Sequence, residues 1–100
     1  MRELEIYISR AIARKLRDRH GVSEAEVMQC FRNRIGKFAV DTRLEHQTDK
    51  PTLWFVSETN KQRRLKVVLI RYSKDCYVVK SAYSPNADEE RLYEKYLSGE

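Results

Sequence analysis

Four residues in the second half of the chain have the side chains that metal-free RNA cleavage requires: Glu58, Arg64, Lys66 and Tyr83. That reaction needs a base for the 2′-hydroxyl proton, a fixed cation for the charge that builds on the phosphate, and an acid for the leaving 5′ oxygen. Glu58 suits the base, and the planar guanidinium of Arg64 suits the phosphate. Lys66 would add a second positive charge, and Tyr83 would donate a proton or stack on a base.

These residues are separated along the chain and meet only if the strands that carry them pair as hairpins. The alternation of apolar and polar side chains predicts strands over 38–43, 52–58, 64–72 and 76–83. One face of the last three strands is then apolar, and the other face is polar at one end. A slip of one residue in either turn would exchange the faces, so the site depends on the register.

The two turns predict that register. If residues 59–63 form the first turn, Glu58 lies opposite Arg64; if Ser73 and Lys74 form the second, Arg64 lies opposite Tyr83. The buried face would then carry Leu53, Phe55, Leu65, Val67, Leu69, Val78 and Ala82. The opposite face would have an apolar end made of Trp54, Val68, Ile70, Tyr77 and Val79. In this register Lys80 falls on the buried face and would have to emerge at its edge.

A simpler interpretation of Glu58 and Arg64 needs no chemistry. Opposite charges on neighbouring strands form a cross-strand ion pair worth roughly 0.2–1 kcal/mol on a solvated face. The aromatic residues of these strands are likewise typical of a sheet core. The sequence alone leaves both interpretations of the polar end open.

A second group of residues suits the backbone of a nucleic acid. Lys61 and Arg63 make the first turn basic, and we place Arg43 and Lys80 with them as phosphate contacts. Charge that keeps a turn soluble is the alternative. The first helix adds another basic surface, which is either solvated or faces an acidic partner or RNA; it consists of Arg10, Arg14, Lys15, Arg17 and Arg19.

The two histidines lead to different expectations. His46 lies in a long polar loop, where its near-neutral pKa would make it an acid or base on the rim of the site. His20 precedes a glycine at the end of a helix, where a cation is favoured for structural reasons. The sequence has neither a recognised metal-ligand spacing nor a glycine-rich phosphate loop, so we expect no metal and no cofactor.

The remaining elements complete an α+β domain. The first residues fit either a strand or a helix face; we favour a short strand through Ile8 and a helix from Ser9 to His20 that Gly21 ends. Capping signals at Ser23 and Asn86 begin two further helices. The order β-α-α-β-β-β-β-α predicts a mostly antiparallel sheet with two N-terminal helices and one C-terminal helix packed on it.

Composition limits the classes of function. The 100 residues (1–100) make one domain, and the formal charge of +5 favours an anionic partner, RNA or an acidic protein. Cys30 and Cys76 are far apart, which argues against a disulfide scaffold and against a zinc finger. With no apolar run of roughly 18 residues and no signal peptide, we expect a cytoplasmic protein with no membrane contact. Whether the chain forms a homo-oligomer stays open.

Several short motifs resemble known bacterial sequences. The segment LRDRHGVSEAEVMQCF (16–31) resembles the Lys-His-Gly-Val-Ser…Phe segment of BrnT toxins, ribonucleases with a RelE-like fold. Residues 78–83 and 90–93 are similar to the last strand and closing helix of that family. Closer still is a family of small proteins related to these toxins, some labelled ADP-ribosyl-(dinitrogen reductase) hydrolases; the shared motifs are DTR (41–43), His46, PTLWF (51–55), LKVV (65–68) and AYSP (82–85).

The resemblance implies a RelE/BrnT-like fold, metal-independent RNA cleavage and a co-encoded antitoxin. One departure concerns the last strand, where BrnT sequences have an Ala-Arg pair and this chain has Ala82 and Tyr83. Either Arg64 replaces that arginine from the neighbouring strand or the activity is lost. The hydrolase label implies much larger helical domains with a carboxylate-bound metal pair, which 100 residues without such ligands do not provide. A non-catalytic module that binds RNA or protein on the same fold is the alternative function.

Overall fold

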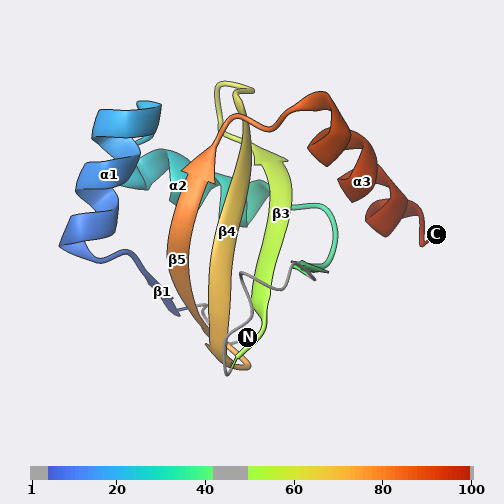
Figure 1. Cartoon of the computed structure of the whole chain (residues 1–100), viewed down its shortest axis with the longest axis horizontal. Coiled ribbons are helices and arrows are strands. Elements are labelled where there is room, and N and C mark those ends of the chain that lie inside the picture. The colour runs from blue at the N-terminus through green and yellow to red at the C-terminus, as the bar shows by residue number, and fades with distance from the viewer. Residues whose placement is uncertain (1–4, 42–49, 100) are drawn as a thin grey trace.

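A five-stranded sheet with helices on both of its faces forms the centre of the molecule (Figure 1). The computed structural model describes residues 5–41 and 50–99. Within these ranges the elements are β1 (Glu5–Tyr7), α1 (Arg10–His20), α2 (Glu24–Asn33), β2 (Ala39–Val40), β3 (Thr52–Glu58), β4 (Arg64–Ser73), β5 (Cys76–Tyr83) and α3 (Ala87–Ser98). The strand order is β1-β5-β4-β3-β2, antiparallel except for the parallel pair β1 and β5. The α+β class predicted from the sequence is confirmed.

The two faces of the sheet pack against different helices. On one face Phe31 of α2 contacts Phe55, with ring centroids 5.0 Å apart. On the other face Trp54 lies 5.6 Å from Tyr93 of α3. Alternation along β3 thus sends Phe55 to α2 and Trp54 to α3, and both side chains are buried. None of the helices in the described ranges is long and apolar enough to cross a bilayer.

The helix boundaries follow the capping residues in the sequence. The Ser9 side chain accepts a hydrogen bond from the backbone N–H of Ile12 and begins α1, so the first segment is a strand followed by a helix, as predicted. Gly21 ends α1 with a left-handed φ of 60°. Ser23 and Asn86 each form a capping box with the glutamate three residues later.

The first hairpin has the predicted register and the second does not. Glu58 lies opposite Arg64 in β3 and β4. Tyr83, however, lies opposite Lys66 and not opposite Arg64, and the β4–β5 register shifts by one residue between Val68 and Leu69. At the Lys66 end the observed pairing differs from the predicted pairing by two residues, so each side chain keeps its predicted face. Beyond the irregularity the two pairings differ by one residue, so the side chains there lie on the opposite face.

The irregularity in β5 is centred on Lys80. Because Val68 pairs with Ser81 and Leu69 with Val79, Lys80 has no opposite residue, and its side chain is exposed. The prediction that Lys80 lies on the buried face is therefore wrong. Regular alternation would have buried a lysine among apolar side chains, which a bulge avoids at the cost of one ladder pair.

Because of the same bulge, three more residues lie on the face opposite to the predicted one. Tyr77 and Val79 lie on the face covered by α1 and α2, where Tyr77 packs 6.1 Å from Phe31; Val78 pairs with Ile70 on the α3 face. These assignments are the reverse of the predicted ones. The predicted strand over 38–43 is also shorter, because β2 contains only Ala39–Val40, and Arg43 lies outside the described residues.

The glycine that ends α1 gives a direct test of local structure. Gly21→Ala should lower the free energy of unfolding by about 1–2 kcal/mol, because alanine is strained at φ 60° although no atom lies within 4 Å of the added Cβ. Gly21→Asn should cost less, since asparagine tolerates this conformation. Chemical denaturation of the three proteins measures both differences. An alanine variant as stable as the glycine protein would contradict the assignment.

Candidate functional site

The structure gathers the four predicted residues of the sheet at one end, under the first turn of α3. Glu58 and Arg64 are cross-strand neighbours, and so are Lys66 and Tyr83. The first turn of α3 adds two carboxylates that the sequence prediction did not include. We call the six residues the sheet-end cluster: Glu58, Arg64, Lys66, Tyr83, Glu89 and Glu90.

Lys66 is the buried centre of this cluster. Its side chain is 7% exposed, and its ammonium lies 2.5 Å from Oε2 of Glu89. The same ammonium lies over the rings of Trp54, at 4.7 Å, and Tyr83, at 5.7 Å. Lys66 thus faces a carboxylate and two aromatic rings and not open solvent, so it positions its neighbours.

Glu89 divides its carboxylate between a helix cap and the sheet. Oε1 accepts the backbone N–H of Asn86 at 3.0 Å, while Oε2 accepts the Tyr83 hydroxyl at 3.2 Å and the Lys66 ammonium. Partial burial opposes ionisation of Glu89, but Lys66, the Asn86 N–H and Tyr83 together lower its pKa below the ordinary value of 4.5. Glu89 is therefore a carboxylate at neutral pH and a fixed partner for Lys66.

Arg64 lies between two carboxylates nearer the surface. Its Nη2 donates to Oε1 of Glu90 at 2.6 Å and its Nε to Oε2 at 3.2 Å, while Nη1 lies 3.5 Å from Oε1 of Glu58. Hydrogen bonding to Glu90 is the largest cause of a raised Arg64 pKa. The Arg64 and Glu58 side chains are 42% and 46% exposed, so both can reach a ligand from solvent.

The charges of the cluster decide what it can do. The cations Arg64 and Lys66 face three carboxylates, so the cluster is already neutralised. A phosphate presents oxygens in much the same planar spacing as a carboxylate, and it binds a guanidinium in the same forked way. The exposed arginine is therefore the position where an anionic group can exchange with Glu90.

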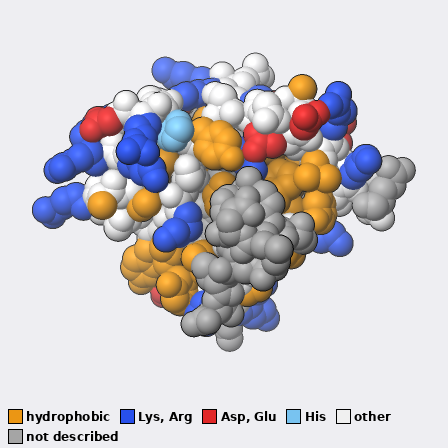
Figure 2. Space-filling view, in the orientation of Figure 1, with side chains coloured by type: hydrophobic (Ala, Val, Ile, Leu, Met, Phe, Trp, Pro, Cys, Tyr) orange, Lys and Arg blue, Asp and Glu red, His pale blue; other side chains and the backbone are white. Residues whose placement is uncertain are grey.

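The sequence identifies Asn86 as a helix cap but does not place Glu89 and Glu90 in the site. The sequence shows that both residues are acidic, but their contacts with the sheet depend on where α3 packs. A further neighbour was also missed: the His20 ring lies 5.6 Å from the Tyr83 ring. Figure 2 shows a histidine side chain between a basic side chain and an apolar patch, with acidic side chains beyond both.

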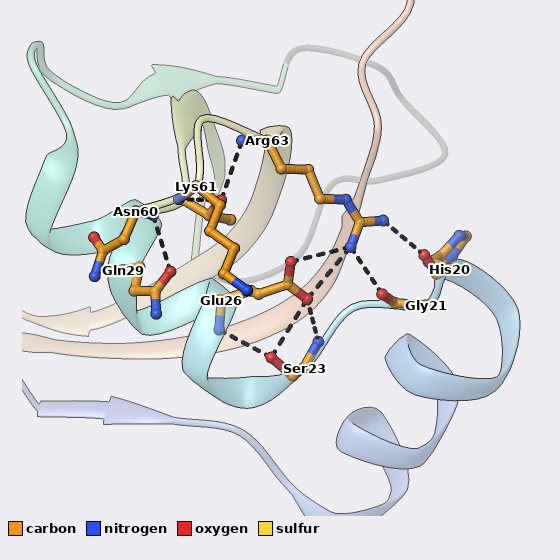
Figure 3. Close-up of polar contacts among 9 residues, drawn as sticks. His20, Gly21, Ser23, Glu26, Gln29, Asn60, Lys61 and Arg63 are labelled. Carbon is orange, nitrogen blue, oxygen red and sulfur yellow. Dashed lines mark hydrogen bonds and ion pairs between the residues drawn. The ribbon is translucent and has the colours of Figure 1, made fainter.

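The basic residues predicted to contact nucleic acid have different surroundings. Lys61 and Lys80 are exposed and make no ion pair within the described part of the chain. Arg63, in contrast, donates to the carbonyl oxygens of His20 and Gly21 at 3.0 and 2.8 Å and pairs with Glu26 at 3.1 Å (Figure 3). Arg63 therefore connects the β3–β4 turn to α1 and α2.

Two predicted residues, Arg43 and His46, lie outside the described residues.

The basic side chains of α1 are all exposed, and only Arg17 has an ion-pair partner within the described part, its neighbour Asp18 at 3.3 Å. The largest body of unpaired positive charge in the described ranges thus lies on α1 and not in the sheet-end cluster.

No family model matches the chain, and no curated protein matches it. The similarity to BrnT toxins stays an expectation that rests on the short motifs given above.

Two neutralising substitutions in the same turn separate a structural arginine from a surface lysine. Arg63→Gln should lower the free energy of unfolding by about 1–2 kcal/mol, because it removes charge-assisted bonds to two helix ends. Lys61→Gln makes the same charge change but should stay within about 0.5 kcal/mol of the wild type. Urea denaturation of both variants checks this. Equal losses would contradict the structural role of Arg63.

The low pKa of Glu89 predicts a pH-dependent contribution to stability. Glu89→Gln should cost about 1–3 kcal/mol at pH 7, because the Lys66 ammonium then lacks its anion. A depressed folded-state pKa contributes stability above the unfolded value near 4.5, and the contribution is lost as the pH falls through the folded pKa. The difference between wild type and Glu89→Gln should therefore shrink below about pH 4.5.

Unfolding curves measured from pH 7 down to pH 3 provide the test. Glu94→Gln is the matched control on the same helix, because Glu94 is exposed and has no hydrogen bond or ion pair in the described part. A pH-independent difference for Glu89→Gln would contradict an ionised Glu89 partner of Lys66.

Proposed function

We propose that this protein is the toxin of a bacterial toxin–antitoxin pair and cleaves RNA in the cytoplasm without a metal ion. The observation that supports the proposal best is Arg64, an exposed guanidinium held between Glu58 and Glu90, on the strand next to Tyr83, whose hydroxyl donates to Glu89. It combines a phosphate ligand, a base and an acid at one end of the sheet. The motif resemblance to BrnT toxins supports the same reaction.

In the proposed reaction, Arg64 holds the scissile phosphate and Glu58 accepts the proton of the adjacent 2′-hydroxyl. The 2′ oxygen attacks phosphorus, a 2′,3′-cyclic phosphate forms and the bond to the 5′ oxygen breaks. Tyr83 supplies the proton that the leaving oxygen needs. Glu58 suits the base because its carboxylate is accessible and 3.5 Å from the guanidinium that would hold the phosphate.

Lys66 and Glu89 act as positioning residues in this proposal. The Lys66 ammonium lies over the Tyr83 ring, and Glu89 accepts the Tyr83 hydroxyl, so the pair fixes where that hydroxyl lies. This role differs from the phosphate contact expected from the sequence, because the Lys66 side chain is only 7% exposed.

Glu90 is the residue that RNA has to displace. Its two oxygens bind the face of Arg64 that a phosphate would take. Surface ion pairs are typically worth roughly 0.2–1 kcal/mol, and this bidentate pair lies toward the upper end, so a phosphate that forms the same forked contact can replace Glu90.

The second candidate is a non-catalytic module that binds RNA or an acidic protein such as an antitoxin. The unpaired cations of α1 favour it, because they are free to contact an anionic partner while Arg64 and Lys66 are already paired. In that case Arg64 would only help to dock α3. Binding would depend on Arg10, Arg14, Lys15 and Arg19.

Substitutions of Arg64 and Glu90 test the proposed site. Arg64→Ala should reduce the rate of RNA cleavage in excess EDTA by about a hundredfold or more. Glu90→Gln should raise RNA affinity about two- to fivefold, because it removes the competing carboxylate. Asp88→Asn is the matched control: it changes the net charge equally on the same helix turn, and Asp88 pairs with Arg91 and not with Arg64.

Gel-based cleavage and fluorescence anisotropy with one RNA measure both effects. Equal RNA affinity of Glu90→Gln and Asp88→Asn would contradict exchange at Arg64. If no protein cleaves RNA and Arg14→Gln weakens binding more than Arg64→Ala does, the binding module is the correct function.

A further inference from the structure

A pocket of about 460 Å³ opens beside Arg64. It lies on the β3 side of Arg64, whereas Tyr83 belongs to β5 on the other side. It lies among the end of β3, the turn after it, and the C-terminal ends of α2 and α3. Its lining residues are Asn33, Ile35, Val56, Ser57, Glu58, Thr59, Asn60, Gln62, Arg64 and Leu97. Two members of the sheet-end cluster, Glu58 and Arg64, thus form part of its wall. The volume is within the range of pockets that hold small organic groups.

The pocket contains hydrogen-bonding groups that the protein itself does not use. Ser57 lies in the wall, 4% exposed, and its hydroxyl is buried with no hydrogen-bond partner in the described part of the chain, so the groups that a ligand can reach are amides. Nδ2 of Asn33 donates to the Glu58 carbonyl oxygen at 2.9 Å and to Oδ1 of Asn60 at 3.0 Å. These bonds leave the side-chain oxygen of Asn33, the side-chain nitrogen of Asn60 and the amide of Gln62 without partners in the described ranges.

The turn that carries two of these amides is held in place. The Thr59 hydroxyl accepts the backbone N–H groups of Lys61 and Arg63, at 3.3 and 3.1 Å. The backbone N–H of Asn60 donates to Gln29 of α2 at 2.9 Å (Figure 3). Gln62 has a φ of 67°, which a non-glycine residue rarely adopts without such support. The backbone of the turn therefore has a fixed position before a ligand arrives, and the bond between Asn33 and Asn60 also orients those two side chains.

Apolar side chains form the remaining wall. Ile35 is 90% exposed and Leu97 is 43% exposed, both unusually open for large aliphatic residues, and Val56, which is buried, also lines the pocket. The pocket thus has an aliphatic wall together with neutral hydrogen-bond donors and acceptors. Among the described residues that line it, Arg64 is the one cation and Glu58 the one anion.

We propose that this pocket binds a nucleobase of the RNA strand whose phosphate lies on Arg64. A base has two apolar faces and an edge of neutral donors and acceptors, which is the chemistry that the wall and the amides match. A phosphate group alone would leave the amides and the aliphatic wall unused. The inference rests on the proposed function in that Arg64 holds the neighbouring phosphate, and it makes this end of the sheet the determinant of base preference.

Side-chain amide signals provide a direct test, because asparagine and glutamine NH₂ groups are visible in ¹⁵N-resolved NMR spectra. The probes are the four nucleoside 3′-monophosphates, the four nucleosides and inorganic phosphate. We expect at least one nucleotide and its nucleoside to shift the amides of Asn33, Asn60 and Gln62, and inorganic phosphate to shift only the Arg64 side chain. Nucleotides that leave all three amides unmoved would overturn the proposal.

Ile35→Ser tests the apolar wall without disturbing the core, because Ile35 is 90% exposed. It should weaken binding of the preferred nucleotide roughly fivefold or more, because it removes apolar surface that the base would bury, while the affinity for inorganic phosphate stays unchanged. Leu92→Ser is the control, an exposed leucine on α3 that does not line this pocket. Equal nucleotide affinities of the two variants would overturn the proposal.

These measurements separate failure of the pocket from failure of the catalytic proposal. Amides that shift with nucleosides in a protein that cleaves no RNA would support the base pocket and reject the ribonuclease. Amides that stay silent in a protein that cleaves RNA in EDTA would reject the pocket and leave the ribonuclease intact.

Discussion

The ion pair between Lys66 and Glu89 is the contact on which the arrangement of this molecule's polar end depends. A nearly buried ammonium is costly unless an anion lies within hydrogen-bond distance, and Glu89 Oε2 lies 2.5 Å away. Glu89 also closes the capping box of α3, so one carboxylate both begins the helix and fixes it to the sheet. The position of α3 on the Trp54 face therefore follows from a charge requirement as well as from apolar packing.

The position of the first turn of α3 also determines which carboxylates pair with Arg64. Glu90 follows Glu89 directly and reaches the guanidinium of Arg64, which Glu58 approaches from the sheet. Lys66 is consequently a permanent part of the structure, whereas Arg64 remains half exposed with a partner that another anion can replace. This difference between two cations on the same strand is the physical basis of the proposed phosphate site.

Much of this arrangement could be predicted from local sequence patterns, and the rest depended on packing. The turn between Glu58 and Arg64 and the alternation beside it specified the first hairpin, and the serine and asparagine caps specified the helix starts. The bulge at Lys80 was not predicted, although a lysine at a buried position of a regular strand was its signal. The roles of Glu89 and Glu90 required the placement of α3 relative to the sheet, which neither capping nor periodicity specifies.

The chemical form of the RNA products is the most direct measurement of the central claim. Purified protein is incubated with a defined RNA in excess EDTA, and the new ends are identified by mass spectrometry. An attack by the 2′-hydroxyl at Arg64 predicts 2′,3′-cyclic phosphate and 5′-hydroxyl ends. Products with 3′-hydroxyl and 5′-phosphate ends, or RNA left intact by both the wild type and the Glu90→Gln protein, would contradict it.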